Sequence, residues 1–156
     1  MSIAVGQKAP DFKLHDTEKN PVSLNDFKGR NVLLLFFPLA FTGVCTDELC
    51  SVRDSLTSYN EMNADVIGIS IDSLFVLDKF KKENDLNFSL LSDFNKEAAT
   101  AYGCLYDSFV FDMQGVAKRS AFVIDKEGVI QYAEVLESAG DLPNFEAIKA
   151  SIAALS

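Results

Sequence analysis

The side chains of this sequence best suited to covalent chemistry are its three cysteines, Cys45, Cys50 and Cys104. Cys45 lies after an apolar run that ends at Phe37, and it begins a segment in which apolar residues recur at helical spacing. A thiol in the first turn of a helix lies close to unpaired backbone N–H groups and to the positive end of the helix dipole, and both favour the nucleophilic thiolate. Cys45 is therefore a candidate nucleophile. The alternative is a buried apolar role, which free cysteines often have.

Three residues near Cys45 are candidates for the same site. Thr42 is placed where threonine often caps a helix. Pro38 follows the apolar run, where a proline commonly ends a strand. Glu48 lies about one helical turn after Cys45, so its carboxylate either complements the helix dipole or holds a cation near the thiol.

The spacing Pro38-x-x-x-Thr42-x-x-Cys45 matches the active-site signature of the peroxiredoxins. The sequence resembles that family over nearly its whole length, from Gly6 to about Leu136, and the stretches that carry the resemblance are 38–43 (PLAFTG), 48–49 (EL), 91–94 (LSDF), 101–103 (AYG) and 119–125 (RSAFVID). Within the family it is most similar to the alkyl hydroperoxide reductase E type, described as one-cysteine peroxiredoxins. The resemblance implies a thiol peroxidase without a cofactor, which acts in antioxidant defence and redox homeostasis.

The resemblance also implies a role for each residue of the signature. Cys45 attacks the O–O bond of a hydroperoxide and becomes a sulfenic acid. The Thr42 hydroxyl and the backbone N–H groups around Val44 and Cys45 donate hydrogen bonds to the peroxide. Arg119 stabilises the Cys45 thiolate and polarises the peroxide with its fixed fork of donors. Pro38 shields the thiolate.

Arg119 has a second interpretation from the residues alone. It follows Lys118, and a pair of basic residues at the start of a strand is also typical of a solvated sheet edge. If Arg119 does reach Cys45, Glu48 is the residue that we expect to hold it in place, as a supporting residue rather than a catalytic one.

The sulfenic acid must meet a second thiol before further peroxide oxidises it irreversibly. The spacing of Cys45 and Cys50 resembles that of another branch, the bacterioferritin-comigratory or Q type, in which the second cysteine resolves the first. On a regular helix the two Cα atoms are roughly 8.5 Å apart and about 140° around the axis, which is too far for a disulfide unless the helix start unwinds. Resolution by Cys50, by Cys104 or by an external thiol, as the E type implies, therefore stays open.

The apolar pattern predicts the elements that position these residues. We expect strands at 31–37, 65–71 and 88–91, helices at 42–62, 74–84, 95–102 and 142–155, and an antiparallel hairpin of 121–125 and 129–134 with Gly128 at its turn. The first strand is apolar throughout, which indicates a central strand buried on both faces. This order predicts a single α/β domain over residues 1–156 with a thioredoxin-like fold, in which helices flank a central mixed β-sheet.

Composition excludes several classes of partner. A net charge of −9 argues against binding to nucleic acid or anionic lipid, and no apolar run is long enough to span a membrane. Motifs for a metal, nucleotide or flavin are absent, and the lone His15 lies in a polar stretch where we expect it to be solvated. The first twelve residues lack the pattern of a signal peptide, so we expect a cytoplasmic protein.

Partners follow mainly from the resemblance. It implies a hydroperoxide substrate, a thioredoxin- or glutaredoxin-like reductant or a small thiol, and a homodimer for which Phe41, Phe109 and Phe111 are candidate contact residues. Two other functions are compatible with a reactive cysteine. A thioredoxin-type oxidoreductase would normally carry a CxxC pair and a proline facing it, and neither is present. A redox-sensing module would need the same thiolate as a peroxidase.

Overall fold

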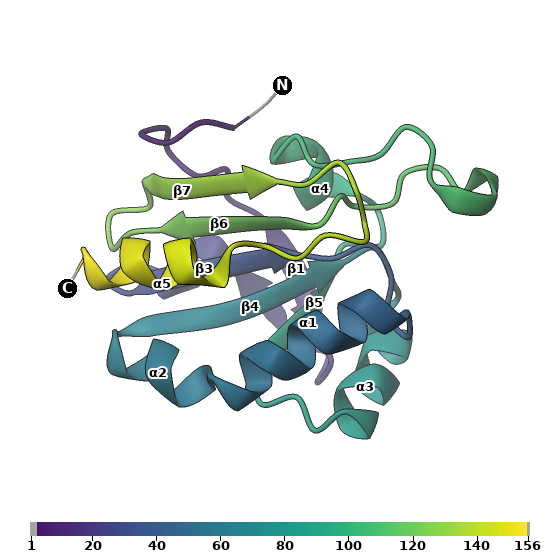
Figure 1. Ribbon diagram of the computed structural model, residues 1–156, viewed down its shortest axis with the longest axis horizontal. Coiled ribbons are helices and arrows are strands. Elements are labelled where there is room, and N and C mark those ends of the chain that lie inside the picture. Colours follow the sequence, from purple (N-terminus) through teal and green to yellow (C-terminus); the bar gives the residue numbers. More distant parts are fainter. Residues whose placement is uncertain (1–2, 156) are drawn as a thin grey trace.

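Within residues 3–155, which the computed structural model describes, seven strands form one mixed sheet in the order β2-β1-β5-β4-β3-β6-β7 (Figure 1). The strands are β1 (Lys13–Asp16), β2 (Pro21–Ser23), β3 (Asn31–Phe36), β4 (Ala64–Ser70), β5 (Ser89–Ser92), β6 (Ser120–Ile124) and β7 (Ile130–Val135). The expected α/β, thioredoxin-like architecture with a central mixed sheet is confirmed.

β3 is the central strand that its apolar sequence predicts. All six of its residues are buried, and it pairs in parallel with β4 and antiparallel with β6. Because β3 and β4 run parallel while β6 runs the opposite way, the carboxyl ends of β3 and β4 and the amino end of β6 meet at one edge of the sheet. Residues that follow β3 or precede β6 are therefore brought together there.

Helices cover both faces of the sheet. They are α1 (Gly43–Asp54), α2 (Leu56–Glu61), α3 (Leu74–Glu83), α4 (Glu97–Ala101) and α5 (Phe145–Ala153), with short 3₁₀ turns at Leu24–Phe27 and Val110–Asp112. The apolar faces of α1, α2, α3 and α5 pack with alternate residues of β3 in one core cluster, whereas α4 packs in a second cluster on the opposite face. Figure 1 shows α1, α2 and α5 together in front of the sheet. Across residues 3–155, no helix is long and apolar enough to cross a membrane.

The single helix expected at 42–62 is wrong, because the segment forms two helices. α1 ends at Asp54 and α2 starts at Leu56, with Ser55 between them at φ −105° and ψ 7°, outside the helical range. The sequence around the break is rich in serine and threonine, which hold a helix weakly and compete for its backbone hydrogen bonds. The apolar spacing continues across the break and hides it.

The remaining elements match the prediction with small differences at their ends. The hairpin of β6 and β7 has Gly128 at its turn with φ +82°, a left-handed conformation that favours glycine. Strands β1 and β2 were not expected. They form a short antiparallel pair at the sheet edge, where polar residues and a proline replace the apolar run that marks a buried strand.

Candidate active site

Cys45 lies in the first turn of α1, just beyond the carboxyl end of β3. α1 starts at Gly43, so the backbone N–H groups of its first turn lack partners within the helix. The Cys45 side chain is only 1% exposed and packs with Leu49 and Val52 in the core cluster beneath α1. Its burial alone would also fit a purely apolar role, so the polar neighbours of the sulfur atom decide the interpretation.

Arg119 is the polar neighbour that contacts the sulfur. Its Nη2 atom donates to Cys45 Sγ at 3.2 Å and also to the backbone oxygen of Ala139 at 2.9 Å. The residue directly precedes β6, whose amino end lies beside the carboxyl end of β3. Arg119 is 1% exposed, so the interpretation as a solvated edge charge is wrong.

Glu48 pairs with Arg119 inside the protein. Arg119 Nη1 donates to Glu48 Oε1 at 2.6 Å, and Glu48 is fully buried. Burial raises the pKa of Glu48 to about 7, although the attraction of Arg119 acts in the opposite direction. The contact supports the holding role that the sequence suggested, because the carboxylate and the Ala139 carbonyl together fix the plane of the guanidinium group.

Thr42 and Pro38 shape the loop between β3 and α1. Thr42 occupies the N-cap position of α1, but its hydroxyl donates to the backbone oxygen of Leu39 at 2.9 Å and does not cap the helix. The side chain is exposed and the hydroxyl can rotate toward a substrate. Pro38 is buried directly after the strand. Of the cluster expected from the sequence, Cys45, Glu48 and Arg119 are in direct contact, while Thr42 and Pro38 flank them on the loop.

The other two cysteines differ in environment, and all three are free thiols. Cys50 is partly buried on α1, and its Sγ atom lies 3.8 Å from Asn84 Oδ1 at the end of α3. Cys104 is fully buried in the core cluster on the opposite face of the sheet from Cys45. Burial raises the pKa of Cys104 to about 12, so its thiolate is scarce at neutral pH.

Sequence reasoning missed two groups at this site. The first is the Ala139 carbonyl, which carries no side-chain signal and comes from a loop after β7. The second is Asp72, whose Oδ2 atom accepts the N–H of Ala40 at 2.8 Å. Asp72-Ser73 reads as a helix start, and Ser73 does cap α3 through its hydroxyl, but Asp72 instead holds the loop before Cys45.

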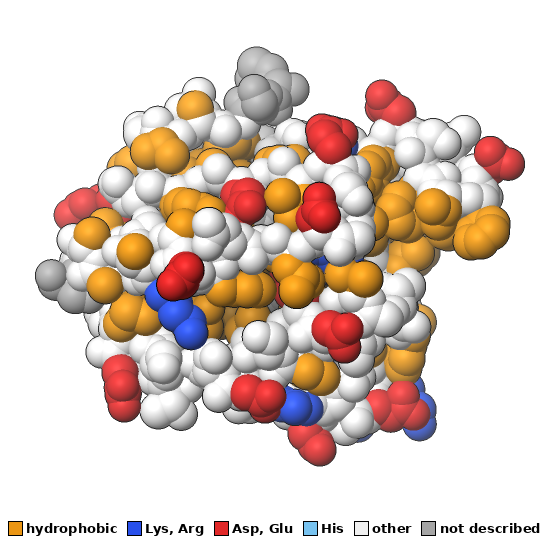
Figure 2. Space-filling view, in the orientation of Figure 1, with side chains coloured by type: hydrophobic (Ala, Val, Ile, Leu, Met, Phe, Trp, Pro, Cys, Tyr) orange, Lys and Arg blue, Asp and Glu red, His pale blue; other side chains and the backbone are white. Residues whose placement is uncertain are grey.

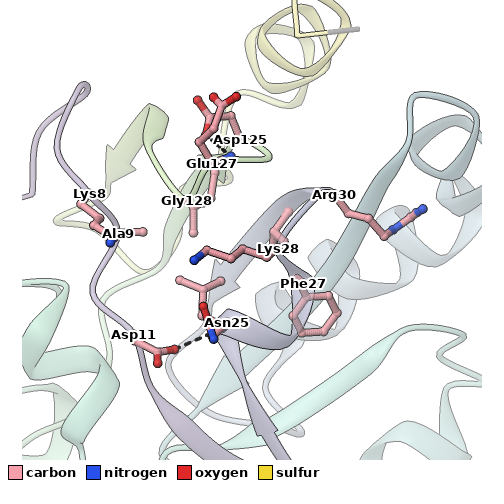
Figure 3. Close-up of a pocket in the computed structure, with 13 residues that line it drawn as sticks. Lys8, Ala9, Asp11, Asn25, Phe27, Lys28, Arg30, Asp125, Glu127 and Gly128 are labelled. Atoms are coloured by element: carbon pink, nitrogen blue, oxygen red, sulfur yellow. Dashed lines mark hydrogen bonds between the residues drawn. The ribbon is translucent and has the colours of Figure 1, made fainter.

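A separate cavity of about 270 Å³ lies at the opposite end of β3 (Figure 3). It is bordered by residues before β3 and by the β6–β7 turn, among them Lys8, Lys28 and Gly128, and Figure 3 shows the Lys28 side chain extending across it. The lining contains no cysteine. The cavity is therefore distinct from the site around Cys45. Among residues 3–155, no group of three or more His, Cys, Asp or Glu side chains is arranged to hold a metal ion.

The fold and the buried Cys–Arg–Glu cluster define a cysteine-dependent protein of the thioredoxin-like class, and comparisons with known proteins narrow the class. Residues 5–133 match the sequence model of the AhpC/TSA family. Peroxiredoxin Bcp of Bacillus subtilis is 42% identical over 130 residues, 82% of each chain, and a putative peroxiredoxin bcp of Coxiella burnetii is 42% identical over 83% of this chain and 87% of its own. The crystal structure of peroxidoxin BcpB from Mycobacterium tuberculosis matches with a TM-score of 0.86 at 28% identity over 97% of both chains.

The chain belongs to the AhpC/TSA family of peroxiredoxins. It is a thiol-dependent peroxidase, which decides against a thioredoxin-type oxidoreductase.

Proposed function

We propose that Cys45 is the peroxidatic cysteine of this enzyme and that Arg119 activates it. The observation that carries the proposal is the 3.2 Å contact between Arg119 Nη2 and Cys45 Sγ in a site that excludes water from both residues. In so buried a place little solvent screens the attraction between the guanidinium group and a negative charge that develops near it. The same donors face the oxygen on which negative charge develops during the reaction.

The proposed reaction transfers one oxygen atom. The Cys45 thiolate attacks the terminal oxygen of a hydroperoxide, an S–O bond forms, and the O–O bond breaks. Sulfur is oxidised to a sulfenic acid and the peroxide is reduced to an alkoxide or hydroxide, which takes a proton and leaves as an alcohol or water. Thr42 and the N–H groups of Val44 and Cys45 hold the peroxide in line with the sulfur, and Pro38 keeps the loop closed over the thiolate.

The test compares Cys45→Ser with the unchanged protein in a single turnover with hydrogen peroxide. We expect no peroxide consumption and no sulfenic acid in the variant, with sulfenic acid measured by dimedone labelling and mass spectrometry. Cys104→Ala is the control, because Cys104 lies on the far face of the sheet, and it should react like the parent. Equal consumption by Cys45→Ser would sink the assignment.

We further propose that Cys50 resolves the sulfenic acid, as in the Q type, to which the similarity to Bcp proteins lends support. The Cys50 thiol would attack Cys45 sulfur, form a disulfide and release the oxygen as water. The two residues lie on one regular helix, so the first turns of α1 must unwind. Mass spectrometry after one equivalent of peroxide checks this step. A Cys45–Cys50 disulfide supports it, and a lasting sulfenic acid would assign resolution to an external thiol, as in the E type.

The proposed substrates are hydrogen peroxide and organic hydroperoxides, which share the O–O bond that the Cys45 thiolate would attack. A thioredoxin- or glutaredoxin-like protein or a small thiol would return the disulfide to the dithiol, in a cytoplasmic setting. Steady-state peroxide consumption with such donors separates an enzyme from a sensor, which would stop after one turnover. We also propose a homodimer formed through the exposed aromatic residues near the site, among them Phe41 and Phe111.

A further inference from the structure

A side chain from a neighbouring strand end anchors the loop that joins β3 to α1. The N–H of Ala40 donates to Asp72 Oδ2 at 2.8 Å, and the same carboxylate oxygen accepts the hydroxyl of Ser70 at 2.7 Å. Ala40 is buried, so its N–H depends on this acceptor and not on bulk water. A charged acceptor binds an N–H more strongly than a neutral one does. Ala40, the residue that this Asp72 anchor holds, lies two positions before Thr42 on the loop that leads to Cys45.

The anchor is itself held by the sheet. Asp72 follows β4, which lies between β3 and β5 in the strand order. The hydroxyl of Ser92 on β5 donates to the backbone oxygen of Asp72 at 2.6 Å, and the N–H of Asp93 donates to the backbone oxygen of Ser70 at 2.7 Å. Asp72 therefore links the loop between β3 and α1 to β4 and β5 through hydrogen bonds.

The loop has a conformation that needs such support. Phe41 lies between Ala40 and Thr42 and has φ +65°, in the left-handed region that a bulky residue occupies only when its surroundings hold it there. Its ring packs against Phe80 of α3, with 5.2 Å between the ring centroids. On the far side, the Thr42 carbonyl accepts the first backbone hydrogen bond of α1 from Thr46. The strained residue is thus clamped between the Asp72 anchor and the start of the helix.

We propose that Asp72 is a positioning residue for the peroxidase reaction, and that release of its hydrogen bond to Ala40 is the first event in the unwinding of α1. The second half of the proposal rests on the proposed resolving role of Cys50. While the bond is intact, Thr42 and the first turn of α1 keep the geometry in which they meet a peroxide. Once it is released, Phe41 leaves its strained backbone conformation, and Cys45 moves with the loop toward Cys50.

The two half-reactions therefore depend on the anchor in opposite ways. Oxidation of Cys45 requires the folded loop, whereas disulfide formation requires the open one. Loss of the anchor should slow the first step and leave the second at least as fast as before. A residue that merely stabilised the fold would not separate the two steps in this way.

The first step is measured on Asp72→Ala and Asp72→Asn in a Cys50→Ser background, where the sulfenic acid accumulates. Rapid-quench dimedone labelling and mass spectrometry give its rate of formation. We expect a loss of about tenfold or more in Asp72→Ala, because small displacements of reacting groups cost large factors in rate. Asp72→Asn retains an oxygen that accepts the Ala40 N–H and should recover most of the rate. Asp78→Ala is the matched control, since Asp78 bonds only Lys82 on α3, and it should match the parent.

The second step is measured with Cys50 present, by acid quench and alkylation after a stoichiometric pulse of peroxide. Conversion of sulfenic acid to the Cys45–Cys50 disulfide should be as fast or faster in Asp72→Ala. An unchanged first step, or equal slowing of both steps, would overturn the proposal.

Two further outcomes also test the proposal: the absence of a disulfide in the parent, and the failure of Asp72→Ala to fold. If the parent forms no Cys45–Cys50 disulfide, the resolving role of Cys50 is wrong and the release step fails with it, while the first-step comparison still decides whether Asp72 positions the loop. If circular dichroism shows that Asp72→Ala does not fold, Ser70→Ala replaces it, because it loosens the carboxylate without touching the loop. A severalfold slower first step is then expected, and an unchanged rate contradicts the positioning role.

Discussion

One guanidinium group divides its donors among three acceptors in the candidate active site. Arg119 bonds the Cys45 sulfur and the Glu48 carboxylate, which both lie on α1, and the Ala139 carbonyl in the loop after β7. A lysine in its place would offer a single compact ammonium group without the planar fork that reaches three directions. The arrangement of polar groups around the Cys45 sulfur thus depends on the shape of the arginine as well as on its charge.

Arg119→Lys should lower the rate constant of Cys45 oxidation by roughly 10²- to 10³-fold, the usual effect of losing one well-placed donor to developing charge. Stopped-flow competition for hydrogen peroxide against a haem peroxidase measures this. Lys118→Arg is the matched control, because the Lys118 ammonium bonds Glu137 at the surface and not the sulfur. A rate within about twofold of the parent for Arg119→Lys would contradict the role of the fork.

Glu48 makes stability depend on pH. Because its folded pKa of about 7 lies above the value in an unfolded chain, the folded protein binds the proton more tightly between these two pH values. The stabilisation is full at low pH and disappears as pH rises through about 7. From pH 5 to pH 8 the free energy of unfolding should fall by about 1–3 kcal/mol more in the parent than in Glu48→Gln.

Urea unfolding at several pH values measures this difference. Glu61→Gln, an exposed change on α2, should keep the pH dependence of the parent. Identical slopes for Glu48→Gln and the parent would show that Glu48 does not titrate in this range.

The elements of the fold were predictable in proportion to how much apolar surface they bury. β3 and β4 stand out because nearly every residue faces a core, and the hairpin stands out because glycine marks its turn. The break between α1 and α2 at Ser55 could not be predicted from the sequence, because the apolar spacing of α1 continues into α2. β1 and β2 were hidden because edge strands carry little apolar sequence.

The residues of the site were predictable only where they lie close together in the sequence. Cys45, Thr42 and Pro38 share one short segment, so their spacing is visible in the sequence. The contact of Arg119 spans 74 residues and was anticipated only through resemblance to a family. The bond from Ala40 to Asp72 spans 32 residues and has no local signature. Contacts between residues far apart in the chain, whether between two side chains or from a backbone group, therefore could not be predicted from the residues alone.

Close packing between strands makes Gly68 on β4 sensitive to a single methyl group. A Cβ atom there would lie 2.7 Å from Leu90 Cδ2 and 3.4 Å from Phe37 Cε1, both in the buried core. Gly68→Ala should therefore lower the free energy of unfolding by about 1–3 kcal/mol, as overpacked cores do. Thermal and urea unfolding measure the loss. Gly140→Ala, which meets nothing closer than 3.7 Å, should change stability little, and equal effects of the two would contradict the packing argument.

At the scale of the whole molecule, an aromatic loop projects beside the active site. Residues 105–117 extend from the body in Figure 1, and apolar side chains gather over this region in Figure 2. Phe111 is 91% exposed and has φ +58°, so it is held in a strained conformation while its ring faces solvent. Large exposed apolar patches typically mark contacts between proteins.

The proposed dimer gives this loop a testable role. Phe111→Ser should shift a concentration-dependent dimer toward monomer by about tenfold or more in dissociation constant, as central aromatic contacts do when truncated. Sedimentation velocity over a range of concentrations measures it. Val5→Ser, an exposed apolar change at the other end of the sheet, should leave the equilibrium as it was. A parent that is monomeric at every concentration would reject the dimer.

Cys104 lies on the opposite face of the sheet from the other two cysteines, and this limits how many cysteines of one chain can be oxidised together. The sheet separates its sulfur from Cys45 and Cys50, and burial raises the pKa of its thiol, so we expect Cys104 to take no part in the reaction. With the proposed Cys45–Cys50 disulfide, a chain with three cysteines would hold a single two-electron thiol–disulfide couple. Titration of accessible thiols in the unfolded protein would read this directly, with three thiols in the reduced chain and one after complete oxidation to the disulfide.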